Sequence, residues 1–159
     1  MPEDENAKAE IFYAQGNYEE AALAWEKAER AGAHSFALFY KKGIALRRLG
    51  RYDDEAAALE KALLLDSNNA EAWRAHALAC SQLDRNAEAA ASSEKALALD
   101  PYNARTWIVR GFALHQLGQY EKAVESYARA IELNPLGGDG RRAWNNRGAA
   151  LDNLHRHEE

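Results

Sequence analysis

The chain has 159 residues, a formal net charge of −5 at neutral pH and a single cysteine, Cys80. The acidic balance argues against a general nucleic-acid binder, because binding to phosphates requires an excess of Lys and Arg on one face. A lone cysteine cannot form an intramolecular disulfide, and neither a signal-peptide core nor a membrane-length apolar run is present, so we expect a cytoplasmic protein that does not bind membranes.

Strong helix formers dominate the composition, and only three prolines occur, which predicts an all-α fold. Residues 1–5 are charged and predicted to fray, and a first helix is expected over about 7–15, ended by Gly16 in a left-handed cap. A second helix is expected over about 18–31, with Trp25 on its apolar face.

The helical pattern recurs with a fixed period. Trp107 follows Trp73 by 34 residues, and the same step connects the small residues Ala28, Ala62, Ala96 and Ala130. It also connects a turn column, Gly16, Gly50, Asp84 and Gly118. The polar residues Ser35, Asn69 and Asn103 recur just before a helix, where their side chains are predicted to cap free N–H groups.

The stretch 103–135 carries the densest pattern, in Trp107, Gly111, Leu114, Gly118, Tyr120, Ala123, Tyr127, Ala130 and Pro135. It resembles the tetratricopeptide repeat (TPR) signature, W-x2-L-G-x2-Y, then A-x3-F, then P, over 34 residues. The resemblance implies a right-handed α-solenoid of helix-turn-helix TPR units, forming one domain over 1–159. The repeats are 2–35, 36–69, 70–103 and 104–137, followed by a partial fifth repeat, 141–159, as an additional C-terminal helix.

The spacing between repeats changes before the fifth repeat. Trp144 follows Trp107 by 37 residues, and the extra residues fall in LGGDGRR, whose clustered glycines predict a loop. A helix is expected over 142–154, and HRHEE is expected to form a turn and the start of the next helix. The half repeat is interpreted as the cut end of a longer array, with a natural terminal cap as the alternative.

Two features depart from the family pattern. Glu55 stands where other repeats have alanine and must reach water on a rotated helix or pair with Lys42 or Arg47. The second is a basic column, interpreted as solvated packing of long side chains: Lys8, Lys42, His76, Arg110 and Arg147.

The family resemblance implies that the first helices of successive repeats line a concave groove that binds a partner. Carried over onto this chain, the groove positions are Tyr40, Lys41, Ile44, Arg47, Arg48, Arg74, Leu78, Gln82, Arg105, Ile108, Val109, Phe112, His115 and Asn145. These residues are basic and apolar, whereas the second helices are rich in Glu and Asp. The segregation favours an acidic peptide with apolar side chains, because Arg offers forked donors to carboxylates.

No known clamp or catalytic motif fits. TPR proteins that grip the C-terminal carboxylates of Hsp70 or Hsp90 use Lys, Asn and Arg at positions that here hold Tyr40, Ile44, Ala75, Arg105 and Val109. The chain has no Gly-rich phosphate loop and no hydrolase or zinc motif, and Cys80 falls in a core column. We expect no enzymatic activity, no cofactor and no metal.

Three functions remain open at this point. The first is a scaffold that binds a protein or peptide in the groove. The second is self-assembly into a homo-oligomer through the C-terminal helix, with Trp144, Leu151 and Leu154 exposed. The third, implied by the family, is a targeting segment of a larger enzyme.

Overall fold

A computed structural model describes the backbone of residues 2–158 and the side chains of residues 3–155. These residues form nine α-helices and no strand, which confirms the all-α class. The helices are α1 (Pro2–Ala14), α2 (Tyr18–Arg30), α3 (Phe36–Arg48), α4 (Tyr52–Leu65), α5 (Ala70–Gln82), α6 (Asn86–Leu99), α7 (Ala104–Gln116), α8 (Tyr120–Leu133) and α9 (Gly138–Glu158).

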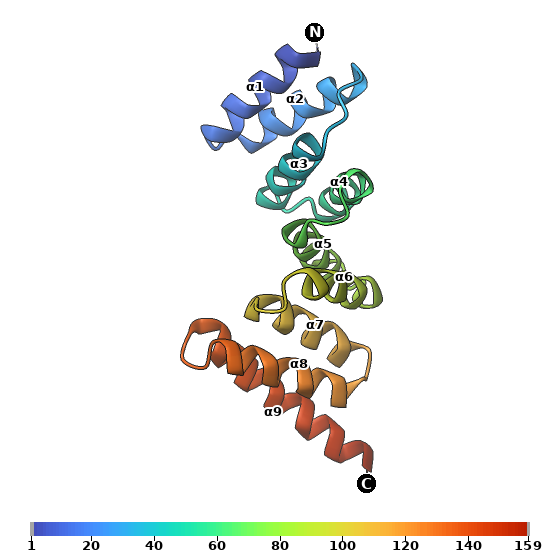
Figure 1. Ribbon diagram of the computed structural model, residues 1–159, viewed down its shortest axis with the longest axis vertical. Helices are drawn as coiled ribbons and strands as arrows, with labels where there is room; N and C mark the ends of the chain where they lie inside the picture. The colour runs from blue at the N-terminus through green and yellow to red at the C-terminus, as the bar shows by residue number, and fades with distance from the viewer. Residues whose placement is uncertain (1, 159) are drawn as a thin grey trace. The chain divides into compact units, whose positions relative to one another are not determined.

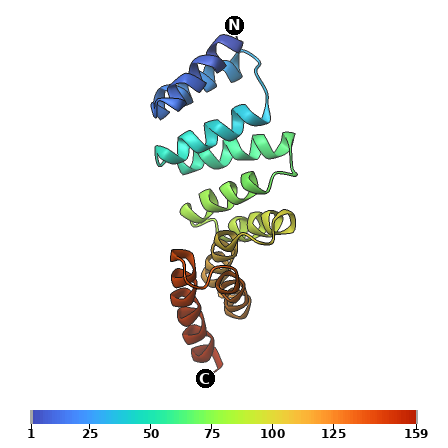
Figure 2. The ribbon, with the colours of Figure 1, turned by 60° about the vertical axis from the view of Figure 1, so that its left-hand side comes forward.

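The chain divides within α5 into two compact units, Met1–Ala79 and Cys80–Glu159. In the first unit α1 packs on α2, and α3 packs on α4, as two hairpins (Figure 1). In the second unit α7 packs on α8, and α9 lies alongside α8 (Figure 2). Each unit has its own apolar core, centred on Trp25 in the first and on Tyr127 in the second. That the two units form the single domain expected over 1–159 stays a prediction.

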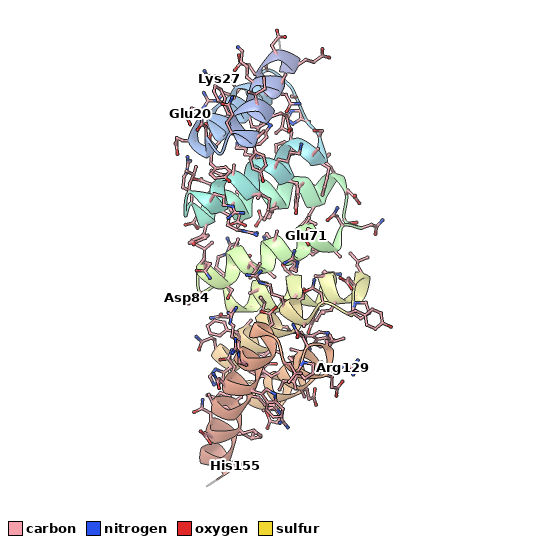
Figure 3. All side chains as sticks on the ribbon, turned by 90° about the vertical axis from the view of Figure 1, so that its left-hand side faces the viewer. Glu20, Lys27, Glu71, Asp84, Arg129 and His155 are labelled. Carbon is pink, nitrogen blue, oxygen red and sulfur yellow. The ribbon has the colours of Figure 1, made fainter. Side chains whose placement is uncertain are left out.

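The turn inside each hairpin needs one residue in the left-handed region. Gly16, Gly50 and Gly118 take φ values of 80°, 72° and 72°, and Asp84 takes 56° at the equivalent place (Figure 3). In every case the following residue donates its N–H to the carbonyl five residues earlier, as Arg85 does to Cys80 at 2.9 Å. The predicted left-handed cap at Gly16 is therefore confirmed, and the same turn forms with an aspartate.

The predicted helix caps are also confirmed. The Ser35 hydroxyl accepts from the N–H of Leu38 at 3.2 Å. The Asn69 and Asn103 side chains accept from the N–H groups three residues later, at 2.9 and 3.1 Å. Each cap satisfies one of the donors that a helix start leaves unpaired.

The prediction that residues 1–5 fray is wrong, because α1 begins at Pro2. Proline suits a first helical turn, and Glu3, Asp4 and Glu5 place negative charge at the positive end of the helix dipole. The turn is also tied to α2, since the Trp25 indole N–H donates to the Asn6 side-chain oxygen at 3.1 Å.

The expected loop at LGGDGRR is largely wrong as well, because α9 begins at Gly138. The glycines there allow close approach: a Cβ on Gly140 would lie 2.0 Å from the Asn134 carbonyl oxygen. The expected turn in HRHEE is absent, since α9 continues to Glu158. Residue 159 lies outside the described residues.

Small residues in the first helices make room for the second helices. A Cβ built on Gly111 would lie 2.7 Å from Cε1 of Tyr127, and one built on Gly43 would lie 3.0 Å from Cγ of Leu59. At the equivalent Gly148 of α9 nothing lies within 4 Å. No described residue fills the space over Gly148 as Tyr127 fills the space over Gly111.

Candidate functional site

The predicted groove residues fall in both units, and each half is described by itself. In the first unit they lie on α3 and α5. Arg48 is exposed, and the other six are half-buried: Tyr40, Lys41, Ile44, Arg47, Arg74 and Leu78.

Arg47 is held by a buried carboxylate. Its Nε donates to Oε1 of Glu55 at 2.6 Å, and its Nη2 donates to the carbonyl oxygen of Ala75 at 3.2 Å. The interpretation of Glu55 as an exposed residue on a rotated helix is wrong, because Glu55 is 0% exposed. Arg47 is the pairing cation, while Lys42 pairs with Glu29 at 3.0 Å.

The electrostatics of Glu55 reflect this burial. Loss of solvent raises the pKa of the Glu55 carboxyl, although the Arg47 guanidinium acts in the opposite direction. The second carboxylate oxygen, Oε2, has no hydrogen-bond partner in the structure. The Glu55 carboxylate is thus only partly compensated, and Arg47 cannot leave it without leaving a buried charge unpaired.

Two further cations of the first unit are also paired. Arg74 donates through Nε to Glu71 at 3.1 Å, and Lys41 binds Glu10 of α1 at 2.6 Å. The Arg74 hydrogen bond lowers the pKa of Glu71, with smaller contributions from Arg47 and Tyr40. Burial, followed by the charge of Glu71, raises the pKa of the Tyr40 hydroxyl.

Arg48 differs from these cations. It makes no ion pair with any residue whose side chain is described. Ile44 lies one helical turn before it and is half-buried. The free charge on this part of α3 is therefore positive and lies beside apolar surface.

In the second unit the groove residues lie at the end of α5, on α7 and on α9. Gln82, Arg105 and Asn145 are exposed, and Phe112 and His115 are half-buried. His115 Nε2 lies 2.8 Å from Nδ2 of Asn153 on α9. Like Arg48, Arg105 makes no ion pair within the described side chains.

Ile108 and Val109 are placed differently from expectation. They are 3% and 8% exposed and belong to the core of the second unit. The expectation that Ile108 lines an open groove is wrong because α7 packs against α6, α8 and α9, which leaves few of its faces open. Among the predicted apolar groove residues of α7, Phe112 is therefore the one that is not buried.

The interpretation of the basic column as solvated is wrong for Lys42, His76 and Arg110, whereas Lys8 is exposed. Lys42 and Arg110 are mostly buried and pair with Glu29 and Glu94, the latter at 3.1 Å. His76 lies 3.4 Å from Glu60. Lys42, His76 and Arg110 thus join the first helix of one repeat to the second helix of the repeat before it. Lys8 instead pairs with Glu5 within α1, and the Arg147 guanidinium lies over the Trp144 ring of its own helix.

Sequence reasoning did not predict the cavities that lie between two second helices, over the first helix that separates them in the sequence. One, of about 700 Å³, lies between α6 and α8 over α7. A second, of about 160 Å³, lies between α2 and α4 over α3, two repeat periods earlier in the sequence. The recurrence of Glu26, Glu60 and Glu94 with the basic column is the signal that could have indicated these grooves.

Two further searches concern sites of other kinds. No group of three or more His, Cys, Asp or Glu side chains in the described part of the chain could hold a metal ion. Within residues 2–158 no helix combines the length and apolar character that crossing a membrane requires.

Solved structures with the same fold cover most of the chain. MamA from AMB-1 is similar, with 24% identity, a TM-score of 0.82, and coverage of 99% of this chain and 84% of that chain. YrrB, a TPR protein with an unusual peptide-binding site, has 26% identity, a TM-score of 0.80, and coverage of 86% and 71%. The first TPR domain of Spaghetti (RPAP3), bound to the HSP90 peptide SRMEEVD, has 25% identity, a TM-score of 0.70, and coverage of 78% and 99%.

The family comparison agrees with these structures. A comparison with curated protein sequences finds no match. Two models of the tetratricopeptide repeat match, one over residues 6–70 and 40–104 and the other over residues 104–135. With the helix hairpins described above, these matches confirm a solenoid of helix-turn-helix units, and the chain belongs to the tetratricopeptide repeat family.

Proposed function

We propose that the chain is a protein-interaction scaffold that binds an acidic peptide segment through its first helices. The observation that carries the proposal is that Arg48 on α3 and Arg105 on α7 are exposed and form no ion pair with any described side chain. Half-buried apolar side chains, Ile44 and Phe112, lie on the same helices. Two similar proteins, YrrB and Spaghetti (RPAP3), are known for a peptide-binding site and a bound peptide, which supports this function.

The paired cations have a different role in the proposal. Arg47 positions α3 against α4 through Glu55, and Arg74 would have to exchange Glu71 for a ligand carboxylate. A peptide carboxylate meets no such competition at Arg48 and Arg105. Forked hydrogen bonds from these two guanidinium groups would then give most of the preference for acidic sequences.

Selection from a displayed peptide library tests the proposal. We expect the wild-type protein to enrich sequences that combine Asp or Glu with large apolar residues. The double variant R48E/R105E should lose the selected peptides by about tenfold or more in affinity, because two attractive charges become repulsive.

A matched control is available on the second helices. Lys27 and Lys122 are also exposed, so K27E/K122E changes the net charge equally and should keep the selected peptides. Equal loss in both double variants, with unchanged helicity, would show that net charge and not the first-helix surface governs binding.

A second candidate function, self-association through α9, is favoured by one observation. Trp144 is 51% exposed, and the space over Gly148 is open. Light scattering over a range of protein concentrations tests it: we expect a dimer that W144A abolishes, and a monomer at the highest concentration would contradict it.

A further inference from the structure

The cavity of about 700 Å³ between α6 and α8 has apolar walls and an aromatic floor. Leu97 and Ala98 of α6 face Ala128 of α8, and the half-buried Trp107 ring lies below them on α7. The Trp107 indole N–H is already used, since it donates to the Pro101 carbonyl at 2.8 Å. What the cavity offers an occupant is therefore mainly apolar surface.

The first unit contains an equivalent groove in a closed form over α3, and a smaller open one of about 320 Å³ beside Trp73. Two repeat periods before Trp107 stands Phe39, and Lys61 lies over it with its ammonium 5.6 Å from the ring centroid. Lys61 also pairs with Glu29 across the groove, and Lys42 binds the same carboxylate. Two cations of the chain thus fill this groove, and about 160 Å³ remains.

Two sequence changes open the groove in the second unit. Leu97 stands where Glu29 stands in the first, so the wall offers no carboxylate. Arg129 stands where Lys61 stands, and it pairs instead with Glu132 of its own helix at 2.5 Å (Figure 3 labels Arg129). Arg129 still lines the cavity, but it does not cross to the opposite wall as Lys61 does in the first groove.

The cations that line the open groove, Arg110 and Arg129, are both paired, so the unpaired charge at its rim is negative. Arg110 is neutralised by Glu94 at 3.1 Å, and it also donates to the Ser126 hydroxyl at 2.6 Å. Glu125 of α8 is exposed and pairs with no described cation. Ala57 occupies the place of Glu125 in the closed groove, which therefore lacks this carboxylate.

We propose that this groove is a second binding site for a protein segment in which a large apolar side chain stands next to Lys or Arg. The apolar side chain occupies the space over Trp107, between Leu97 and Ala128, and the neighbouring cation pairs with Glu125. The charge preference is opposite to that of the first-helix surface. One chain would then bind an acidic segment on its first helices and a basic one between its second helices.

The probe is a capped peptide, Gly-Lys-Phe-Lys-Gly, followed by NMR of the indole N–H signals. The chain has four tryptophans, and W107F identifies the signal of Trp107. We expect this signal to shift saturably with the Lys-Phe-Lys peptide and to shift much less with Gly-Glu-Phe-Glu-Gly or Gly-Lys-Ala-Lys-Gly. Equal shifts with all three peptides, or no saturable shift, would overturn the proposal.

Two variants test the residues. A98L adds a side chain at the mouth of the groove and should weaken the shift, and the fold tolerates leucine there because Leu64 is its repeat equivalent and is 86% exposed. E125K should weaken binding about threefold to fivefold, whereas E121K, one turn away on the exposed face of α8, should not. Binding that neither A98L nor E125K changes would place the peptide elsewhere.

Two further readouts separate this proposal from the others. A shift of the Trp107 signal on changing protein concentration alone would show that a second copy of the chain occupies the groove, which would overturn it. R48E/R105E should bind the Lys-Phe-Lys peptide as the wild type does, so loss of the first-helix site and loss of this groove are distinguishable.

Discussion

Arg47 donates to the fully buried carboxylate of Glu55 at 2.6 Å, at a position where three other repeats have alanine. The two side chains differ in exposure, because the Arg47 side chain is 30% exposed and the Glu55 side chain is 0% exposed. Loss of the partner therefore costs the glutamate more than the arginine, since only the arginine can turn to water.

The first prediction is that R47M destabilises the protein strongly. It leaves the Glu55 carboxylate buried without a cation, which costs about 3 kcal/mol or more in the free energy of unfolding. E55A should cost much less, and the double variant R47M/E55A should recover most of the loss. Urea unfolding of the four proteins measures this cycle, and additive single-variant effects would contradict it.

The second prediction concerns pH. Burial raises the pKa of Glu55 above its ordinary value of 4.5, so the folded protein takes up this proton at a higher pH than the unfolded chain. The folded state gains stability from this group as pH falls through the raised pKa toward 4.5, and the gain is complete below that value.

Comparison with E55Q isolates this effect. The wild type should gain stability relative to E55Q on acidification from neutral pH to about 4.5, while the other carboxylates cancel in the difference. Urea unfolding of both proteins over this range measures it. If the difference in unfolding free energy between the two proteins does not change with pH, or if the wild type loses stability relative to E55Q on acidification, Arg47 fully compensates the Glu55 charge.

The repeat pattern predicted most of the fold because every hairpin solves the same packing problem. Trp25, Ala28 and Ala130 are buried at the positions that the period indicates, and Ser35, Asn69 and Asn103 cap the helices that follow them. Periodic apolar and capping residues constrain local structure strongly, which is why the sequence alone identifies them.

The candidate site was harder to predict, because side-chain pairing depends on neighbouring helices. The period places Ile108 and Arg47 on α7 and α3, but it does not show that packing buries Ile108 or that Glu55 engages Arg47. The start of α1 was missed for a related reason, since the bond from Trp25 to Asn6 is made by tertiary structure. The binding role of the first-helix residues stays a prediction.

The third prediction is that D84G stabilises the protein. Asp84 has a φ of 56°, where a side chain other than glycine is strained, and glycine stands at the equivalent turns. Relief of the strain should add about 0.5 to 1 kcal/mol, and G50D should remove about as much. Thermal unfolding measures both, and a destabilised D84G would mean that the Asp84 side chain stabilises the turn.

The fourth prediction contrasts two glycines at the same repeat position. G111A places a methyl group 2.7 Å from the Tyr127 ring, which has no space to retreat because Tyr127 is fully buried, so we expect a loss of about 1 to 3 kcal/mol. G148A meets nothing within 4 Å and should gain about 0.5 to 1 kcal/mol, since alanine favours the helix over glycine. Urea unfolding of both variants measures the difference. Equal effects at the two positions would mean that a side chain covers Gly148 in solution, as Tyr127 covers Gly111, and the monomeric protein would then have no open slot on α9.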